Sequence, residues 1–119
     1  MRFRNTLAAA AGALALVVSL PTSAEAATGE FFYRFSGPTG EVTTRMLLDP
    51  GSFDCLTLWD VTRPLAEPAH SPLNRTDEWA TVYTGLNCDG DSFTLRPHTG
   101  HASERLKMRS VRFTPFRPE

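Results

Sequence analysis

Two histidines that flank a glycine turn, His98 and His101, form an H-x-x-H pair, the spacing in this chain that most resembles part of a metal site. A structural zinc site needs four protein ligands, and a catalytic zinc site needs three and a water. The remaining histidine, His70, is far away in the sequence. Because two histidines complete neither kind of site, we interpret them as exposed loop residues and predict no metal and no cofactor.

The other residues with catalytic potential have no arrangement that would activate them. The chain lacks a G-x-S-x-G sequence, and its two cysteines are not free once they form a disulfide. A pair of carboxylates for glycoside cleavage stays open on sequence grounds, but a chain this small leaves little room for a substrate cleft. Asp89 and Asp91 could form a weak metal site, although two aspartates in a turn are more often turn formers. We therefore predict that the protein is not an enzyme.

The first 26 residues have the layout of a signal peptide. Arg2 and Arg4 give a positive start, an apolar run covers residues 7–20, and Ala24 and Ala26 form a small-x-small cleavage site. A retained membrane anchor is the alternative, but the run is shorter than the roughly 20 residues that a spanning helix needs. We predict cleavage near Ala26, secretion, and no stable membrane insertion.

The remaining chain, residues 27–119, is long enough for one small domain. It holds 93 residues, with 10 Lys and Arg against 12 Asp and Glu, so its net charge is −2. A nearly neutral domain offers no electrostatic attraction for nucleic acid or an anionic membrane. We expect a monomer whose partner is an extracellular protein.

Cys55 and Cys88 are the only cysteines, and both lie in the part of the chain that we expect to be exported. Disulfides form and persist outside the cytosol, so we predict that these two cysteines are bonded; two free thiols are the alternative. Their separation of 33 residues predicts a stabilisation of roughly 3–4 kcal/mol from the restricted unfolded chain.

Short apolar alternations separated by Gly, Pro and Asp turns predict strands rather than helices. In the first of them, Phe31, Tyr33 and Phe35 share one face. This pattern is typical of an all-β sandwich or barrel. The predicted strands cover residues 30–36, 42–46, 55–59, 79–84, 92–95 and 110–113.

The segment from Asp60 to Glu78 differs from the rest because it carries three prolines, Pro64, Pro68 and Pro72, and has no sustained period. Prolines at this density are incompatible with a regular helix or a central strand. We predict a loop that connects two halves of the domain. The sequon Asn74-Arg-Thr76 falls in this segment, although it means little in a bacterial protein.

The two halves repeat one frame, a tyrosine followed at seven residues by a glycine and then by an alternating strand. Tyr33 and Gly40 begin the first copy, and Tyr83 and Gly90 begin the second. A recurrence of roughly 45–50 residues is the scale of one supersecondary unit.

This frame resembles the Greek-key motif of the βγ-crystallins, in which an aromatic residue closes a folded hairpin, a glycine takes a positive φ, and a serine before a short strand caps the hairpin. The resemblance implies a small two-motif Greek-key β-sandwich with one disulfide. An unrelated sandwich with coincidental turns is the alternative. The matching residues are Tyr33 and Gly40 in the first motif and Tyr83, Gly90 and Ser110 in the second, while Cys55 stands where the first motif would have its serine.

In these terms the first motif covers about residues 30–59, the connecting loop 60–78, and the second motif about 79–114. Many members of the family bind calcium through an acidic or Asn pair just before the serine. Here that place holds the sequence RLKMRS, residues 105–110, which supplies no hard oxygen ligand. The resemblance therefore does not extend to calcium binding.

We expect function to lie in the connecting loop, because prolines stiffen a loop and so reduce the entropy lost on binding. Its candidate binding residues are Arg63, Leu65, His70 and Leu73. Small secreted bacterial relatives of the βγ-crystallins include inhibitors of extracellular metallopeptidases, so the resemblance implies a secreted non-enzymatic binding protein, most concretely a peptidase inhibitor. A loop that merely connects the motifs is the alternative.

Two further functions stay open on the sequence. The resemblance also implies a toxin-like antimicrobial or cell-envelope-binding protein, which would use the only basic cluster. Arg105, Lys107 and Arg109 share one face of that cluster if they lie on a strand, with Arg112 close by. A structural or stress-related envelope protein without a discrete target is the third possibility.

Overall fold

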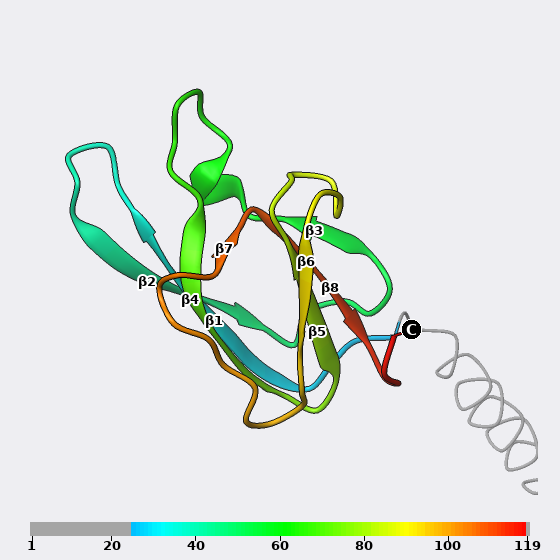
Figure 1. The fold of residues 1–119 in the computed structure, drawn as a ribbon. Helices are drawn as coiled ribbons and strands as arrows, with labels where there is room; N and C mark the ends of the chain where they lie inside the picture. The colour runs from blue at the N-terminus through cyan, green and yellow to red at the C-terminus, as the bar shows by residue number, and fades with distance from the viewer. Residues whose placement is uncertain (1–24, 119) are drawn as a thin grey trace, which may run out of the picture.

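The computed structural model describes residues 25–118, which form two antiparallel four-stranded sheets packed face to face (Figure 1). The first sheet has the strand order β2-β1-β4-β7 and the second β3-β8-β5-β6. The prediction of an all-β sandwich is confirmed. The strands are β1 (Gly29–Ser36), β2 (Val42–Leu48), β3 (Cys55–Thr57), β4 (Ala69–Thr76), β5 (Trp79–Tyr83), β6 (Ser92–Leu95), β7 (Lys107–Met108) and β8 (Ser110–Thr114), and a short 3₁₀ helix covers Trp59–Val61.

The predicted signal peptide, residues 1–26, lies almost wholly outside the described residues. Within residues 25–118, no helix is long and apolar enough to cross a membrane.

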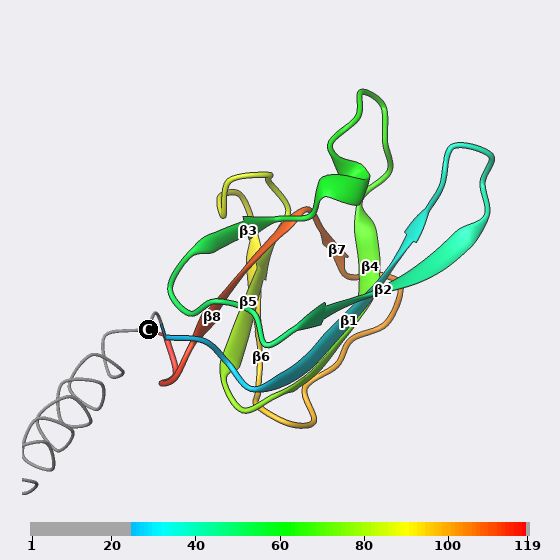
Figure 2. The ribbon, with the colours of Figure 1, turned by 180° about the vertical axis from the view of Figure 1, so that it is seen from behind.

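The two halves of the chain exchange their third strands. β1, β2 and β4 of the first half are joined in one sheet by β7 of the second half, and β5, β6 and β8 are joined by β3 of the first half. β3 follows the β1–β2 hairpin in the chain, but it lies on the other side of the sandwich, beside β8 (Figure 2). Each sheet is therefore complete only when both halves are present.

The aromatic residues of β1 share one face, as predicted, and that face supplies the centre of the core. Phe31, Tyr33 and Phe35 are buried between the sheets. Phe31 meets Phe113 of the opposite sheet edge to face, with ring centroids 5.3 Å apart, an arrangement that aromatic pairs prefer. Other large apolar side chains that are fully buried include Leu58, Leu95, Met108, Val82 and Val111.

The prediction that residues 60–78 form a loop is wrong for its second half, because residues 69–76 are β4, a central strand. Pro72 is tolerated there because the pairing between β1 and β4 shifts register between Phe32 and Arg34, and Ser71 takes a φ of 56°. Residues in a bulge of this kind do not pair in the ladder, so no ladder hydrogen bond is lost because proline has no N–H. The Pro72 carbonyl accepts a hydrogen bond from Ala102 N–H at 3.1 Å.

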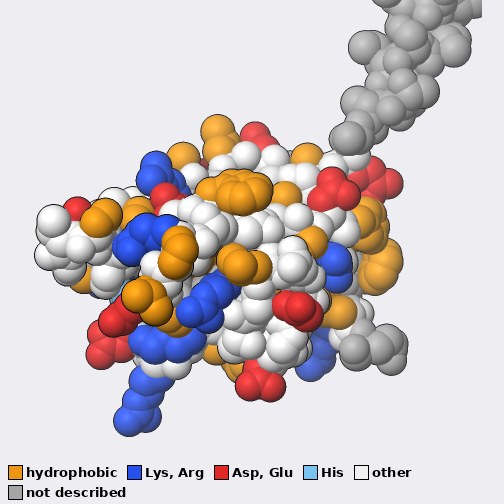
Figure 3. Space-filling view, turned by 90° about the horizontal axis from the view of Figure 1, so that it is seen from above, with side chains coloured by type: hydrophobic (Ala, Val, Ile, Leu, Met, Phe, Trp, Pro, Cys, Tyr) orange, Lys and Arg blue, Asp and Glu red, His pale blue; other side chains and the backbone are white. Residues whose placement is uncertain are grey.

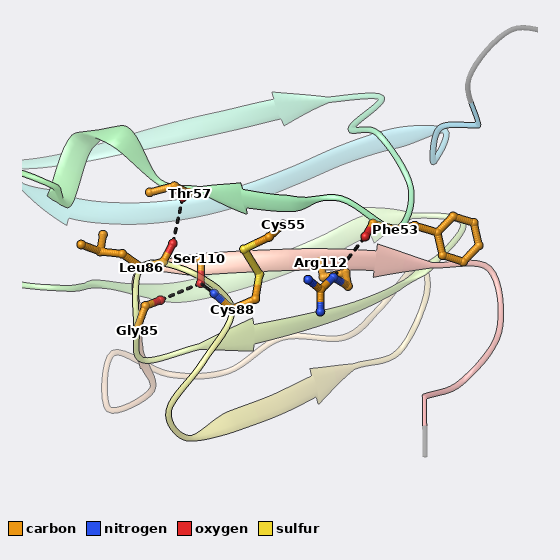
Figure 4. Close-up of a disulfide and its surroundings, with 8 residues drawn as sticks. All are labelled: Phe53, Cys55, Thr57, Gly85, Leu86, Cys88, Ser110 and Arg112. Carbon is orange, nitrogen blue, oxygen red and sulfur yellow. Dashed lines mark hydrogen bonds between the residues drawn. A yellow bond between two sulfur atoms is a disulfide. The ribbon is translucent and has the colours of Figure 1, made fainter.

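The predicted Cys55–Cys88 disulfide is present, with Cα atoms 5.9 Å apart (Figure 4). Cys55 begins β3, opposite Arg112 of β8, and Cys88 lies in the hairpin between β5 and β6. The bond therefore fastens the exchanged strand β3 to the hairpin of the sheet that receives it.

Candidate functional site

The hairpin between β5 and β6 is held against the sheet by hydrogen bonds to Ser110 and Thr57. Ser110, which is fully buried, accepts a hydrogen bond from Cys88 N–H (2.8 Å) and donates one to the Gly85 carbonyl (2.6 Å) (Figure 4). Thr57 of β3 donates to the Leu86 carbonyl at 2.8 Å. Gly90 has a φ of +81°, a conformation that favours glycine. This end of the domain is a rigid support.

The first half lacks the equivalent serine cap. Gly40 has the expected positive φ of +92°. However, Cys55 does not occupy the place of the capping serine, because it lies in β3 of the other sheet. The residue across from Tyr33 falls in the bulge of β4, where the Ser71 hydroxyl bonds to His70 Nδ1 (2.8 Å) instead of to a hairpin.

Residues 58–68, which connect β3 to β4, project from one end of the sandwich beside the β1–β2 hairpin (Figure 1). We call this segment the clamped loop. Leu58, Val61 and Ala66 are buried and root the loop in the core. Between the buried residues Val61 and Ala66, residues 63–65 are exposed to solvent.

The first clamp is a carboxylate held from two sides. Asp60 accepts a hydrogen bond from the Tyr33 hydroxyl (2.6 Å) and forms an ion pair with Arg45 (2.8 Å). This is the only ion pair within residues 25–118. Burial, followed by the hydrogen bond to Asp60, raises the pKa of the Tyr33 hydroxyl well above its usual value of 10. A neutral phenol therefore donates to a charged acceptor, which is a strong kind of hydrogen bond.

Two arginines clamp the far side of the loop. Arg63 donates to the Ser36 carbonyl at the base of the β1–β2 hairpin (3.2 Å). Arg109 donates to the Ala66 carbonyl in the loop (3.4 Å) and to the Thr84 carbonyl in the β5–β6 hairpin (3.3 Å). The loop is thus fastened to both neighbouring hairpins.

The tip of the clamped loop is a turn over residues 63–66, closed by a hydrogen bond from Ala66 N–H to the Arg63 carbonyl (3.1 Å). Proline at the second position and a φ of 64° for Leu65 at the third position identify a type II turn. The third position of this turn favours glycine, and an L-residue there costs roughly 1–2 kcal/mol. Leu65 takes that conformation and is fully exposed (101%).

Of the four candidate binding residues, the clamped loop contains Arg63 and Leu65, whereas His70 and Leu73 lie in β4. His70 is paired in register with Lys107 and is partly buried. Burial, and then the charge of Lys107, lower the pKa of His70. Leu73 pairs with Phe32 on the outer face of the first sheet. The structure therefore separates the predicted group into two surfaces.

Leu73, but not His70, lines a hollow of about 670 Å³ on the outer face of the first sheet. Phe32 and Leu73 form its apolar part. Arg34 and Arg75 contribute positive charge, while Glu30 is its one carboxylate. Its lining also includes Thr44 and His101.

The residues that could hold a metal do not come together. His101 Nδ1 faces the Thr99 carbonyl (3.1 Å), and His98 lies in another hollow beside Trp79. Across residues 25–118 there is no group of three or more His, Cys, Asp or Glu side chains that could bind a metal ion.

The basic residues near the C-terminus do not share one face, so that prediction is wrong. Arg105 lies in a turn before β7, and Lys107 Nζ donates to the Glu104 carbonyl (2.7 Å). Arg109 points to the clamped loop, and Arg112 donates to the Phe53 carbonyl (3.1 Å). The strand through Lys107 is only two residues long, so it cannot align the cluster.

The asparagine of the predicted sequon is buried by the fold. Asn74 is fully buried, and its side-chain amide donates to the Glu78 and Arg96 carbonyls at 2.8 and 3.0 Å. The nitrogen that would carry a glycan is therefore part of the internal hydrogen bonding of the sandwich.

Sequence reasoning missed Asp60 and Arg45, which determine how the clamped loop is held. Asp60 is 27 residues from Tyr33 and 15 from Arg45, so only the tertiary fold brings the three together. Viewed from the end on which the loop projects, the hydrophobic side chains form several separate groups between charged ones (Figure 3). The clamped loop itself exposes two large apolar side chains, Leu65 (101%) and Trp59 (78%).

Comparison of the chain with known protein families, with curated proteins and with solved structures finds no match.

Proposed function

We propose that the protein is a secreted, non-enzymatic binding protein built from two Greek-key motifs of the βγ-crystallin type, and that its clamped loop inhibits an extracellular peptidase. The strand order supports the motif assignment. β4 returns beside β1, and β8 returns beside β5, as the fourth strand of a Greek key returns beside the first. The third strand of each motif crosses to the opposite sheet.

The observation that carries the proposed function is the conformation of Leu65. The side chain contacts solvent on all sides, and its backbone occupies a region that glycine would occupy without strain. Local strain without compensating contacts within the protein indicates a role outside it. An apolar side chain held in this way suits insertion into the specificity pocket of a partner.

The clamps around Leu65 explain why the loop can bind tightly. Asp60 is fixed by Tyr33 and Arg45, and the loop is rooted by buried residues at both ends. A loop that is already ordered loses little conformational entropy when it is bound. Protein inhibitors of peptidases benefit from this property, because their interfaces are of ordinary size and yet are among the tightest known.

The test is to titrate the purified protein into a panel of metallo-, serine, cysteine and aspartic endopeptidases, together with Leu65→Gly and Leu65→Ala. We expect stoichiometric inhibition of one class. Both variants should lose about 2–4 kcal/mol of binding, which is roughly 30- to 1,000-fold in the inhibition constant. Leu65→Gly should fold at least as stably as the wild type, because it relieves the positive φ.

Phe116→Ala is the matched control, because Phe116 is also exposed (64%) and apolar but lies outside the clamped loop. It should inhibit as well as the wild type. Failure of the wild-type protein to inhibit any of the four classes would overturn the proposal. Equal inhibition by Leu65→Gly would place the inhibitory surface elsewhere. We propose no second function, since the basic residues needed for a toxin-like surface point in different directions.

A further inference from the structure

The first sheet ends in an unusually long free edge, the strand β2. Its seven residues compare with two in β7, three in β3 and four in β6, the strands at the other three edges. Figures 1 and 2 show the β1–β2 hairpin at the rim of the sandwich. An edge of this length presents a row of backbone groups that can pair with another strand.

The ladder between β1 and β2 shows which backbone groups are free. Gly37 N–H donates to the Glu41 carbonyl at one end of the ladder, and Asp49 N–H donates to the Gly29 carbonyl at the other, both at 2.8 Å. Hydrogen-bonded pairs alternate along an antiparallel ladder, so residues 43, 45 and 47 bond to β1. The N–H and C=O groups of residues 42, 44, 46 and 48 therefore point to the open edge.

Three of the same four residues have apolar side chains, and the fourth is Thr44. Val42, Met46 and Leu48 are 59, 44 and 62% exposed, and they lie on the outer face with Phe32. Natural edge strands are usually protected by proline, by charges or by a covering element. β2 contains no proline, and its one charged residue, Arg45, is paired with Asp60.

We propose that β2 docks an extended segment of a partner protein, which adds to the first sheet as a further antiparallel strand. Its apolar residues would lie opposite Val42, Met46 and Leu48, and an acidic residue would lie opposite Arg45. Charge supports this choice of occupant. Arg45 keeps half of its side chain exposed (53%) although it is paired with Asp60, so its guanidinium can also accommodate a carboxylate of the added strand.

A second copy of the chain fits this edge less well. Full antiparallel pairing of β2 with β2 of another molecule would place the two Arg45 residues directly opposite each other, which is destabilising. Shifted pairing would avoid the repulsion only by shortening the overlap. A partner strand with glutamate opposite Arg45 can pair along the whole length of β2, and its charge attracts Arg45 instead of repelling it.

The probe is the labelled peptide Val-Thr-Val-Glu-Val-Thr-Val, acetylated and amidated, and the measurement is fluorescence anisotropy with the purified protein. Thr44→Pro removes one edge N–H without breaking a bond to β1, and proline is tolerated on the open side of an edge strand. We expect Thr44→Pro to weaken binding at least tenfold. Thr44→Val, which keeps the N–H, is the matched control and should bind like the wild type.

Two altered peptides test the chemistry of the occupant. Replacing glutamate by lysine should weaken binding at least threefold, and N-methylation of alternate backbone nitrogens should abolish it. The proposal is overturned if the probe does not bind at its solubility limit, or if a folded Thr44→Pro variant binds it equally well. It is also overturned if sedimentation shows a dimer that Thr44→Pro dissociates, because the edge would then belong to a second copy. The result does not depend on Leu65, so this site and the clamped loop can be tested separately.

Discussion

Replacing Tyr33 with phenylalanine should make the stability of the protein less sensitive to alkali. Tyr33 is 2% exposed, and its hydroxyl lies 2.6 Å from an oxygen of Asp60. Ionisation in the folded state would create a buried phenolate beside a carboxylate, and this is why the pKa of Tyr33 is raised. The chain offers few competing titrations at high pH, since it has two tyrosines, one lysine and no free cysteine.

The sign follows from the proton balance of the two states. Above about pH 10 the unfolded chain loses the Tyr33 proton, whereas the folded protein keeps it. The unfolded state then binds fewer protons, so the free energy of unfolding falls as the pH rises, by about 1.4 kcal/mol for each unit above about pH 10. Near neutrality, Tyr33→Phe should cost about 1.5–3 kcal/mol, the usual contribution of a hydrogen bond to a charged group.

The assay is denaturant unfolding, followed by tryptophan fluorescence, from about pH 8 to about pH 11, a range that brackets the usual tyrosine pKa. The cost of Tyr33→Phe should be constant up to about pH 10 and should then shrink by about 1.4 kcal/mol per unit. Tyr83→Phe, measured in parallel, subtracts the contribution of the other phenol. A cost that stays the same across the whole range would refute the assignment of a protonated Tyr33 bonded to Asp60.

Three other predictions concern stability. Replacing Cys55 and Cys88 together with serine should lower the free energy of unfolding by roughly 3–4 kcal/mol, and identical unfolding curves for the oxidised and reduced wild type would contradict this. Ser110→Ala, which removes two hydrogen bonds of the β5–β6 hairpin, should cost about 1–3 kcal/mol, whereas the exposed Ser92→Ala should cost less than about 0.5 kcal/mol. Because the pKa of His70 is lowered, the unfolded chain takes up a proton first as the pH falls below about 6.5, so stability should decline there, and His70→Gln should decline less in thermal melts. An equal decline in both proteins would show that His70 does not contribute.

The sequence predicts most strands because their alternation is local. The bounds predicted for the strand at residues 92–95 agree with β6, and the buried face of β1 follows directly from its three aromatic residues. β4 could not be predicted, because Pro72 and the bulge at Ser71 interrupt the period by which a strand is recognised. β7 has only two residues, which is too short to show any period.

The candidate site was also predictable only in part, because it depends on contacts between residues that are distant in the sequence. The density of prolines correctly places Arg63 and Leu65 in an exposed loop, but it cannot show that the chain returns to the sheet at Ala69. The clamp on Asp60 depends on Tyr33 and Arg45 in different strands. Contacts of this kind leave no signal in a single sequence.

The exchange of β3 and β7 also determines when this chain can fold during its synthesis. β3 emerges early, but its only strand partner, β8, is among the last segments to be made. One edge of β4 pairs with β1, and its other edge stays open until β7 is made. Synthesis proceeds from the N-terminus, so β3 has no strand partner and β4 has an open edge until the end of the chain is made, and Cys55 has no partner for oxidation until Cys88 is made. Residues 107–114 then complete both sheets almost at once, so a chain that stops before them would leave β3 without a strand partner and the edges of β4 and β5 open to aggregation.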